Sequence, residues 1–261
     1  MTVSVIILTT GSEEQQWRTR LVLESLLDQE TKPLEVVVVD GVGTCDGMAR
    51  VTYEFVGRLP LSFRKLEPSP RPFRAAEARN LGVATLTQKP DRILFLDGDC
   101  VADPGLIRTH NLYRKKHIVA AARVHVNPND LNLAKPTIKQ VFSAKNTRDK
   151  RDYHPENWST QECCYTCNLS MGYELFQKIG GFWERVGLGE DREMAMRAIR
   201  AGGEVVFLSV PSVYHLDHPV WRPIHRDTIL DGDVTYDDSV KMPGYIRPVP
   251  DMDKIDSGTV R

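Results

Sequence analysis

The chain has 261 residues, a length that suits one large α/β domain or two small ones. Hydrophobic residues make up 41% and charged residues 26%, proportions that are typical of a folded protein and exclude a disordered one. The 34 Lys and Arg nearly balance the 35 Asp and Glu, and the resulting net charge of -1 argues against a nucleic-acid binder.

The first half of the chain alternates between strand-like and helix-like patterns. Short apolar runs predict strands at residues 3–8, 35–39, 63–66 and 92–96, and helical spacing of apolar residues predicts helices at 14–29, 48–56 and 75–86. This order favours an α/β fold with a mainly parallel central sheet flanked by helices. Ligands bind such sheets at the carboxyl ends of the strands, so the polar residues found there become site candidates: Thr9, Asp40, Asp97 and Asp99.

The second half is less regular. We expect a helix over 104–115, a strand over 118–124, a surface loop over 145–161, helices at 173–179 and 191–201, and a strand over 204–208 that leads into a strand-like segment at 209–213. After His218 the chain is rich in Pro and Asp with little periodicity, which predicts an extended C-terminal extension over 219–261.

Membrane and secretion signals are weak in this sequence. No apolar run approaches the roughly 20 residues of a membrane helix, and the N-terminus leads straight into a strand pattern without room for a signal peptide. The cysteine count is odd and low for a disulfide scaffold, which favours reduced thiols: Cys45, Cys100, Cys163, Cys164 and Cys167. The segment Cys163–Cys167 contains a single Cys-x-x-Cys pair, too few ligands for a structural zinc site, so we expect a core-packing role there. We therefore expect a cytoplasmic protein with no transmembrane segment, for which peripheral contact with a membrane remains open.

The sharpest chemical feature is Asp97-Gly98-Asp99, directly after a predicted buried strand. Two carboxylates separated by one residue can share a cation, and Gly98 allows a tight turn and the close approach of a ligand. Mg²⁺ and Mn²⁺ prefer such oxygen ligands and commonly bridge to phosphates. A solvated turn is the competing interpretation, because Asp-Gly pairs are common turn formers.

A second pair of acids, Glu190 and Asp191, follows Gly189 at the start of a predicted helix. The helix dipole favours ionised carboxylates there, which suits a general base that takes a proton from a hydroxyl. A simple helix cap explains the same pattern.

Two further clusters carry weaker signals. His215 and His218 follow a strand-like segment and can supply a metal ligand, although paired surface histidines are common. Arg79 and Asn80 lie in a predicted helix, with Arg71 and Arg74 upstream, and suit phosphate or sugar groups as well as they suit a solvated helix face.

Taken in order, these segments resemble the glycosyltransferase family 2 type of nucleotide-sugar glycosyltransferases, which have the GT-A fold. The resemblance rests on segments spread over residues 2–218: Val3–Ile7, Val37–Asp40, Ala78–Gly82, Leu94–Asp99, Cys167–Ser170, Gly180–Phe182, Glu190-Asp191 and a late histidine. The stretch from Gly180 to Glu193 also resembles the C-terminal segment of galactosyltransferase-type enzymes. The family implies a single GT-A domain over 1–218, with a nucleotide-binding half at about 1–100 and an acceptor half at about 101–218.

The resemblance also implies roles for individual residues. It implies that Asp191, with Glu190 beside it, is the base of an inverting, metal-dependent transfer of a sugar to an acceptor hydroxyl. Nucleotide-sugar contacts, with UDP as the expected nucleotide, are implied for Thr9, Asp40, Arg79, Asn80, Asp97 and Gly98. Ligands of Mn²⁺ or Mg²⁺ are implied at Asp99 and His215, with Asp97 and His218 as further candidates.

The acceptor stays open among a glycan, a lipid-linked sugar and a protein. Two other functions compete with transfer. A nucleotidyltransferase needs a Gly-rich basic loop after its first strand, whereas residues 9–14 are acidic with one glycine. A non-catalytic nucleotide-sugar or glycan-binding module has no need of a working base, whereas both Asp99 and Asp191 are present here.

Overall fold

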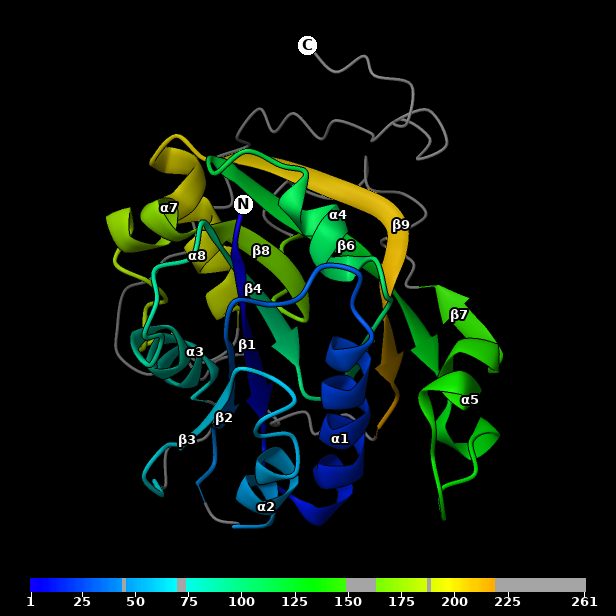
Figure 1. Cartoon of the computed structure of the whole chain (residues 1–261). Coiled ribbons are helices and arrows are strands. Elements are labelled where there is room, and N and C mark those ends of the chain that lie inside the picture. The colour runs from blue at the N-terminus through cyan, green and yellow to red at the C-terminus, as the bar shows by residue number, and fades with distance from the viewer. Residues whose placement is uncertain (44–45, 70–73, 149–162, 187–188, 219–261) are drawn as a thin grey trace.

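The structure is a computed structural model that describes residues 1–43, 46–69, 74–148, 163–186 and 189–218. Within these ranges the chain forms one curled sheet that is covered by helices (Figure 1). The α/β class expected from the sequence is therefore confirmed.

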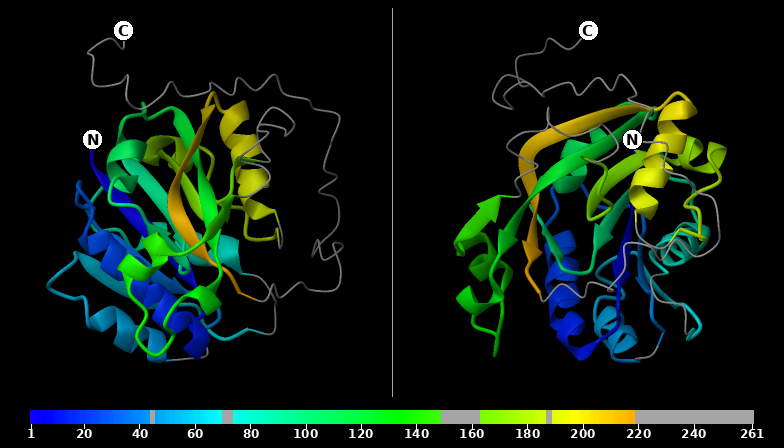
Figure 2. Two further views of the ribbon diagram at one scale, coloured as in Figure 1. Left: turned by 90° about the vertical axis from the view of Figure 1, so that its right-hand side faces the viewer. Right: turned by 180° about the vertical axis from the view of Figure 1, so that it is seen from behind.

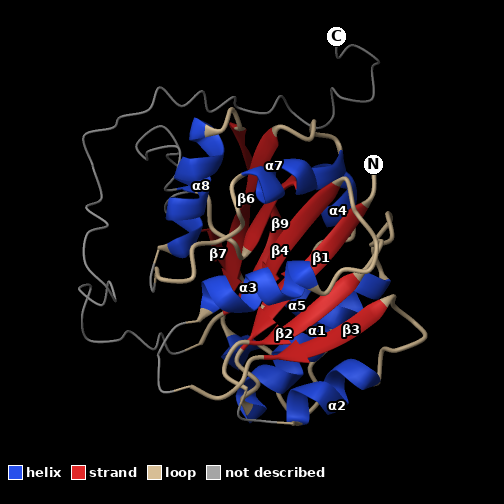
Figure 3. Ribbon diagram, turned by 90° about the vertical axis from the view of Figure 1, so that its left-hand side faces the viewer, coloured by secondary structure: helices blue, strands red, loops and turns tan. Residues whose placement is uncertain are grey.

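Four parallel strands form the first part of the sheet: β1 (Val3–Thr9), β2 (Val36–Asp40), β3 (Leu61–Lys65) and β4 (Arg92–Asp97). β1 lies between β2 and β4, and β3 lies on the outer side of β2 (Figure 3). Their connections carry the helices α1 (Glu13–Leu27), α2 (Gly47–Tyr53) and α3 (Ala75–Ala84). β1, β2 and β4 are almost entirely buried, as expected of strands that are covered on both faces.

The remaining strands run in mixed directions: β5 (Cys100–Ala102), β6 (His117–Val126), β7 (Asn146–Arg148), β8 (Asn168–Gly172) and β9 (Glu204–Leu216). β8 lies antiparallel between β4 and β6, while β9 runs parallel to β6. The order along the sheet is β3-β2-β1-β4-β8-β6-β9-β5, and β7 also pairs with β6. The helical elements of this half are α4 (Leu106–Asn111), the 3-10 turn η1 (Pro128–Asp130), α5 (Ile138–Ser143), α7 (Tyr173–Lys178) and α8 (Glu190–Arg200).

The core has two main layers, one on each face of the sheet. Val5 and Ile7 of β1 belong to the cluster that includes α1 and α2, whereas Ile6, between them, belongs to the cluster with α3, α7 and α8. This alternation is the two-residue period of a strand buried on both faces. Figure 2 shows α8, in yellow, packed on the sheet well away from α1, in blue.

The turn from β1 into α1 holds the carboxyl end of β1 at one edge of the sheet. Gly11 has a φ of 72°, a left-handed conformation that favours glycine. The Ser12 hydroxyl then caps α1 by accepting a hydrogen bond from the backbone N–H of Gln15 at 3.2 Å. Glu13 and Glu14 in the first turn suit the helix dipole.

The structure differs from the sequence prediction at several elements. The helix expected over 104–115 is shorter and ends at Asn111. The carbonyl oxygens of Tyr113 and Arg114 instead accept hydrogen bonds from the Arg92 guanidinium at the start of β4, at 3.0 and 2.6 Å. The strand expected at 204–208 and the strand-like segment at 209–213 form the single strand β9. Three strands and one helix were not predicted: β5, β7, β8 and α5.

The cysteines in the described ranges are buried free thiols: Cys100, Cys163, Cys164 and Cys167. The core packing expected for the last three is therefore confirmed. Several sequence predictions concern residues outside the described ranges, namely Cys45, Arg71, the loop beyond residue 148 and the extension over 219–261.

Candidate active site

The turn between β4 and β5 carries the Asp-Gly-Asp motif. A Cβ atom at Gly98 would lie 2.7 Å from the Thr19 hydroxyl oxygen and 3.0 Å from Cβ of Thr9, so only glycine fits without displacing its neighbours. The Gly98 N–H donates to the Leu8 carbonyl at 2.7 Å, and its carbonyl accepts from the Thr19 hydroxyl at 3.0 Å. The turn is therefore anchored to β1 and α1, which fixes the backbone between the two carboxylates.

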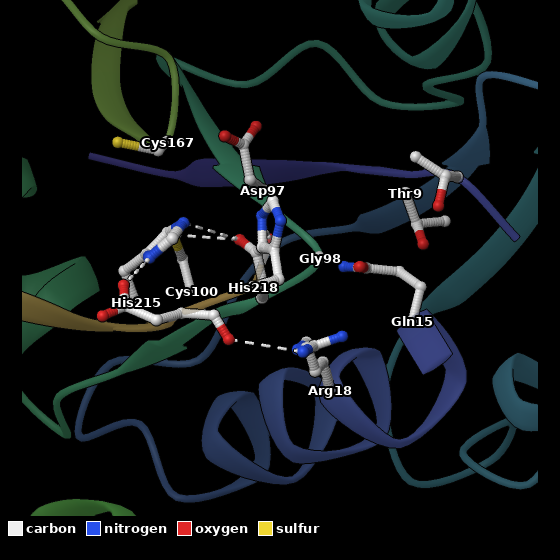
Figure 4. Close-up of polar contacts among 12 residues, drawn as sticks. Thr9, Gln15, Arg18, Asp97, Gly98, Cys100, Cys167, His215 and His218 are labelled. Carbon is white, nitrogen blue, oxygen red and sulfur yellow. Dashed lines mark hydrogen bonds and ion pairs between the residues drawn. The ribbon is translucent and has the colours of Figure 1, made fainter. Parts of the chain in front are cut away.

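Two histidines, His215 and His218, lie close to each other (Figure 4), and both approach the buried Asp99. His218 Nε2 lies 3.1 Å from Asp99 Oδ2, and His215 Nε2 lies 3.8 Å from Asp99 Oδ1. Burial alone would raise the pKa of Asp99, but the hydrogen bond from His218 and the nearby His215 hold that pKa below its usual value. Burial lowers the pKa of His215, which favours the neutral imidazole that can bind a metal.

One ligand atom from each of Asp99, His215 and His218 lies within 4.8 Å of the others, so the three residues can hold one metal ion. A carboxylate oxygen with two imidazole nitrogens is a donor set that suits Mn²⁺ better than Mg²⁺, which prefers oxygen ligands alone. The ligand atoms of a second group, His125, His215 and Asp217, also lie within 4.8 Å of one another, and this group shares His215 with the first.

Asp97, the other acid of the motif, pairs with Arg79. Arg79 Nη2 lies 3.1 Å from Asp97 Oδ1, and Arg79 Nη1 lies 2.6 Å from Glu190 Oε1. The Arg79 guanidinium also lies over the Phe182 ring, 5.7 Å from its centroid. One buried cation on α3 therefore connects the end of β4 to the start of α8.

Glu190 and Asp191 open α8 after Gly189, which has a φ of 87°. Burial, together with the negative charge of Glu190, raises the pKa of Asp191 to about 7. Desolvation and the neighbouring carboxylate thus outweigh the helix dipole, which by itself favours an ionised Asp191. A pKa near 7 suits a general base, which must both accept and release a proton at neutral pH.

Asp191 and Asp97 open into one pocket of about 360 Å³. The charged residues of its lining are acids and arginines. Its walls come from α3, β4, β6, the segment before β8 and the start of α8: Arg79, Asp97, Arg123, Tyr165, Thr166, Cys167, Gly189, Glu190, Asp191 and Arg192. Arg123 and Tyr165 were not singled out from the sequence. Arg123 lies over the Tyr165 ring at 5.8 Å, and its Nη1 donates to Cys167 Sγ at 3.0 Å.

Two further candidate nucleotide contacts, Thr9 and Asp40, lie at the carboxyl ends of β1 and β2. Asp40 Oδ1 accepts hydrogen bonds from the backbone N–H groups of Val42 and Gly43, at 2.9 and 3.0 Å. Its Oδ2 is buried with no hydrogen-bond partner in the described part of the chain, and a Cβ atom at Gly11 would lie only 2.3 Å from it. The orphaned oxygen can accept a hydrogen bond from a ligand N–H. Thr9, also buried, contacts the Thr19 hydroxyl at 3.3 Å.

Asn80 supports the chain around the pocket. Its Nδ2 donates to the Phe182 carbonyl and to Glu184, at 2.8 and 2.9 Å, and its Oδ1 accepts from the Phe182 N–H at 2.9 Å. These bonds tie α3 to the segment before α8. Asn80 thus positions Phe182, which packs against Arg79.

The structure adds His125 and Asp217 to the residues around the candidate metal ligands. The parallel pairing of β6 with β9 places His125 opposite His215. A sequence pattern could single out the histidines but not this pairing, because the two residues lie on strands whose adjacency is set only by the fold.

The fold resembles solved glycosyltransferase structures. One is TarS 1-349 of S. aureus in complex with UDP-GlcNAc, with 18% identity, a TM-score of 0.59 and coverage of 84% of this chain and 60% of that one. Another is the mannosyltransferase PcManGT of Pyrobaculum calidifontis in complex with GDP-Man and Mn²⁺, with 17% identity, a TM-score of 0.57 and coverage of 82% and 56%. The chain thus spans about 60% of the length of these structures.

No curated protein sequence matches the chain significantly. None of the helices in the described ranges has the length and apolar character that crossing a membrane requires. The sequence model of one family, Glycosyltransferase like family 2, matches residues 2–226. Because this match covers most of the chain and the fold is that of GT-A glycosyltransferases, the chain belongs to glycosyltransferase-like family 2.

Proposed function

We propose that this chain is a metal-dependent, inverting glycosyltransferase that moves a sugar from a nucleotide-sugar donor to an acceptor hydroxyl. The observation that carries the proposal is the pocket in which the Asp191 carboxylate shares its walls with Asp97 and Arg79. Asp99, His215 and His218 are not among the residues that line the pocket, but the charges of Asp99 and His215 act on Asp97, which does line it.

In this proposal Asp191 is the general base. Its carboxylate takes the proton of the acceptor hydroxyl, and the hydroxyl oxygen forms a bond to the anomeric carbon of the donor. The bond from that carbon to the diphosphate oxygen breaks, and the leaving nucleoside diphosphate keeps the electron pair. A single displacement of this kind inverts the anomeric centre and needs only one base.

Asp99, His215 and His218 would hold the metal ion, Mn²⁺ in preference to Mg²⁺. The ion, when bound, stabilises the negative charge that develops on the leaving diphosphate. Asp97 pairs with Arg79 and faces the pocket, which suits contact with the donor ribose or sugar.

Arg79 and Glu190 organise the base. Glu190 is buried and paired with Arg79, so it acts on Asp191 through its charge and not as a second base. Arg79 offsets part of that charge and lowers the pKa of Asp191, while Glu190 raises it. Burial is the main cause of the raised pKa of Asp191, and the charges of Glu190 and Arg79 adjust that pKa further.

The donor is proposed to be a UDP-sugar. The orphaned Oδ2 of Asp40 supports this, because it can accept the ring N–H of uracil. Gly98, in the turn after Asp97, lies close to Thr9 at the same edge of the sheet. The structural neighbours bind UDP-GlcNAc in one case and GDP-Man in another, so GDP is the necessary comparison. The acceptor is a hydroxyl of a glycan, a lipid-linked sugar or a protein.

Calorimetric titration of UDP and GDP, each with and without Mn²⁺, tests this assignment. We expect Mn²⁺-dependent binding of UDP that exceeds that of GDP, and its loss in the Asp99→Ala variant. Asp130→Ala, which removes an exposed acid from η1, is the matched control and should bind as the wild type does. Unchanged affinity in Asp99→Ala would exclude a metal role for that residue. Stronger binding of GDP would move the donor to GDP-sugars.

A further inference from the structure

Asp217 lies between two histidines at the end of β9. Its Oδ1 lies 2.6 Å from His125 Nδ1 and 3.2 Å from His215 Nδ1. The two imidazole rings are 5.0 Å apart and nearly edge to face. Asp217 Oδ1 therefore contacts the Nδ1 atom of each ring.

The Asp217 backbone is fixed at this place. Its N–H donates to the Val126 carbonyl at 2.9 Å, and its carbonyl accepts from Arg18 Nη2 at 3.3 Å (Figure 4). The preceding residue, Leu216, donates its N–H to the Asp99 carbonyl at 2.9 Å. The chain that carries Asp217 is thus attached to β6, to α1 and to Asp99.

The two nitrogens of His215 face different partners. Nδ1 faces Asp217, and Nε2 faces Asp99 at 3.8 Å. An ionised carboxylate only accepts hydrogen bonds, so its contact with Nδ1 requires the hydrogen on Nδ1. A neutral His215 then has its lone pair on Nε2, on the side of Asp99. Outer partners of this kind orient metal-binding histidines and fix their tautomer.

We propose that Asp217 is a positioning residue for the metal site: it holds His215 with the hydrogen on Nδ1 and the Nε2 lone pair toward Asp99, and His125 holds Asp217 in place. This proposal rests on the metal site proposed above. In this arrangement His125 and Asp217 do not bind the ion themselves, although they form a group with His215 that meets the distance criterion for a metal site.

The first test determines which nitrogen of His215 carries the hydrogen in the absence of metal. Histidine-labelled full-length protein at pH 8, where an ordinary imidazole is neutral, gives the protonated nitrogen of each ring from long-range ¹H–¹⁵N spectra. We expect His215 to carry its hydrogen on Nδ1 in the wild type. In Asp217→Ala we expect a mixture of tautomers or the hydrogen on Nε2.

The second test measures Mn²⁺ affinity by electron paramagnetic resonance in the presence of UDP. Loss of an outer partner typically weakens metal binding about 10- to 100-fold, and we expect this range for Asp217→Ala. Asp217→Asn keeps an oxygen acceptor but loses the charge, so it should weaken Mn²⁺ binding less than Asp217→Ala does. Removing the ligand in His215→Ala should weaken binding more than either.

The chain offers a matched control in the His117–Glu204 pair, in which Nε2 and Oε2 lie 3.2 Å apart at the other end of the β6 and β9 pairing. Glu204→Gln disrupts a histidine–carboxylate contact of the same kind, and should leave both the His215 tautomer and Mn²⁺ affinity unchanged.

The positioning role and the metal site fail in different ways. An unchanged His215 tautomer in Asp217→Ala overturns the role of Asp217, whether or not Mn²⁺ binds. Absence of Mn²⁺ binding to the wild type overturns the metal site and with it the positioning role. Losses in Asp217→Ala and His125→Ala as large as in His215→Ala would show that the second histidine group binds the ion directly, which also overturns the proposal.

Discussion

Arg79 and Glu190 are 111 positions apart in the chain, yet Arg79 Nη1 lies 2.6 Å from Glu190 Oε1 in a buried setting. The same guanidinium reaches Asp97 through its other terminal nitrogen at 3.1 Å. Arg79 therefore joins α3 and the end of β4 to the start of α8, and it brings the proposed base next to the Asp-Gly-Asp motif.

Replacing Arg79 should destabilise the fold. Arg79→Met leaves Glu190 and Asp97 without their buried cation, and breaking a buried pair of this kind costs about 3–5 kcal/mol. Urea unfolding measures the change. Lys89→Met is the control, because its pair with Glu174 is well exposed and is worth no more than about 1 kcal/mol. If the free energy of unfolding falls by the same small amount in both variants, the buried Arg79 pairs do not stabilise the fold as expected.

Glu190→Gln should shift the pH dependence of activity. The Glu190 charge raises the pKa of Asp191, so its removal should lower that pKa below about 7. The acid limb of kcat/KM reports the ionisation of the free enzyme and should therefore move to lower pH. The measurement is UDP release from the active UDP-sugar at fixed Mn²⁺ concentration. A limb that stays in place or moves to higher pH would refute the proposed coupling.

Asp191→Asn should change stability in a pH-dependent way. The folded-state pKa of about 7 exceeds the ordinary value of 3.8, so the native state binds the proton more tightly and loses stability as the pH rises between these values. Asparagine removes this loss. We compare the free energy of unfolding of Asp191→Asn with that of the wild type at two pH values. We expect this difference to favour the variant by on the order of 1–3 kcal/mol more at pH 8 than at pH 4.5.

Chemical unfolding of both proteins at the two pH values provides the comparison. Asp130→Asn, at an exposed position of η1, should show no such dependence. If the stability difference between Asp191→Asn and the wild type is the same at both pH values, Asp191 does not have a raised pKa.

Gly98→Ala should disturb the motif turn. The added Cβ would lie 2.7 Å from the Thr19 hydroxyl oxygen and 3.1 Å from the Leu8 carbonyl oxygen, so the turn must shift. Forced repacking of this kind costs about 1–3 kcal/mol, and displacement of Asp99 should also weaken Mn²⁺-dependent UDP binding. Gly105→Ala is the control, since its nearest contact is the Asp103 side chain at 3.3 Å. Wild-type stability and binding in Gly98→Ala would mean that the turn tolerates a side chain.

The sequence predicted the parts of this architecture that depend on local pattern. The apolar runs of β1, β2 and β4 identified buried strands, and the polar residues at their ends, Thr9, Asp40 and Asp97, lie at one edge of the sheet, as expected for parallel strands. Asp191 was identified at a helix start, and the structure brings it to the same pocket as Asp97.

The features that the sequence did not predict depend on pairing between distant segments. β8 is a short strand that inserts antiparallel between β4 and β6, and nothing in its five residues specifies those neighbours. The contact of Asp217 with His125 depends on the register of β6 with β9, which also includes a shift between Ala121 and Arg123. The raised pKa of Asp191 depends on burial beside Glu190, which a helix-start pattern does not reveal.

The most direct test of the account compares donor binding and turnover in Asp191→Asn. UDP affinity in the presence of Mn²⁺ and UDP release from a panel of UDP-sugars, with water as acceptor, are measured for this variant and the wild type. We predict retained Mn²⁺-dependent UDP binding with turnover lowered at least about 100-fold, because only the base is removed. Turnover near the wild-type rate with intact binding would contradict the role of Asp191 as the base.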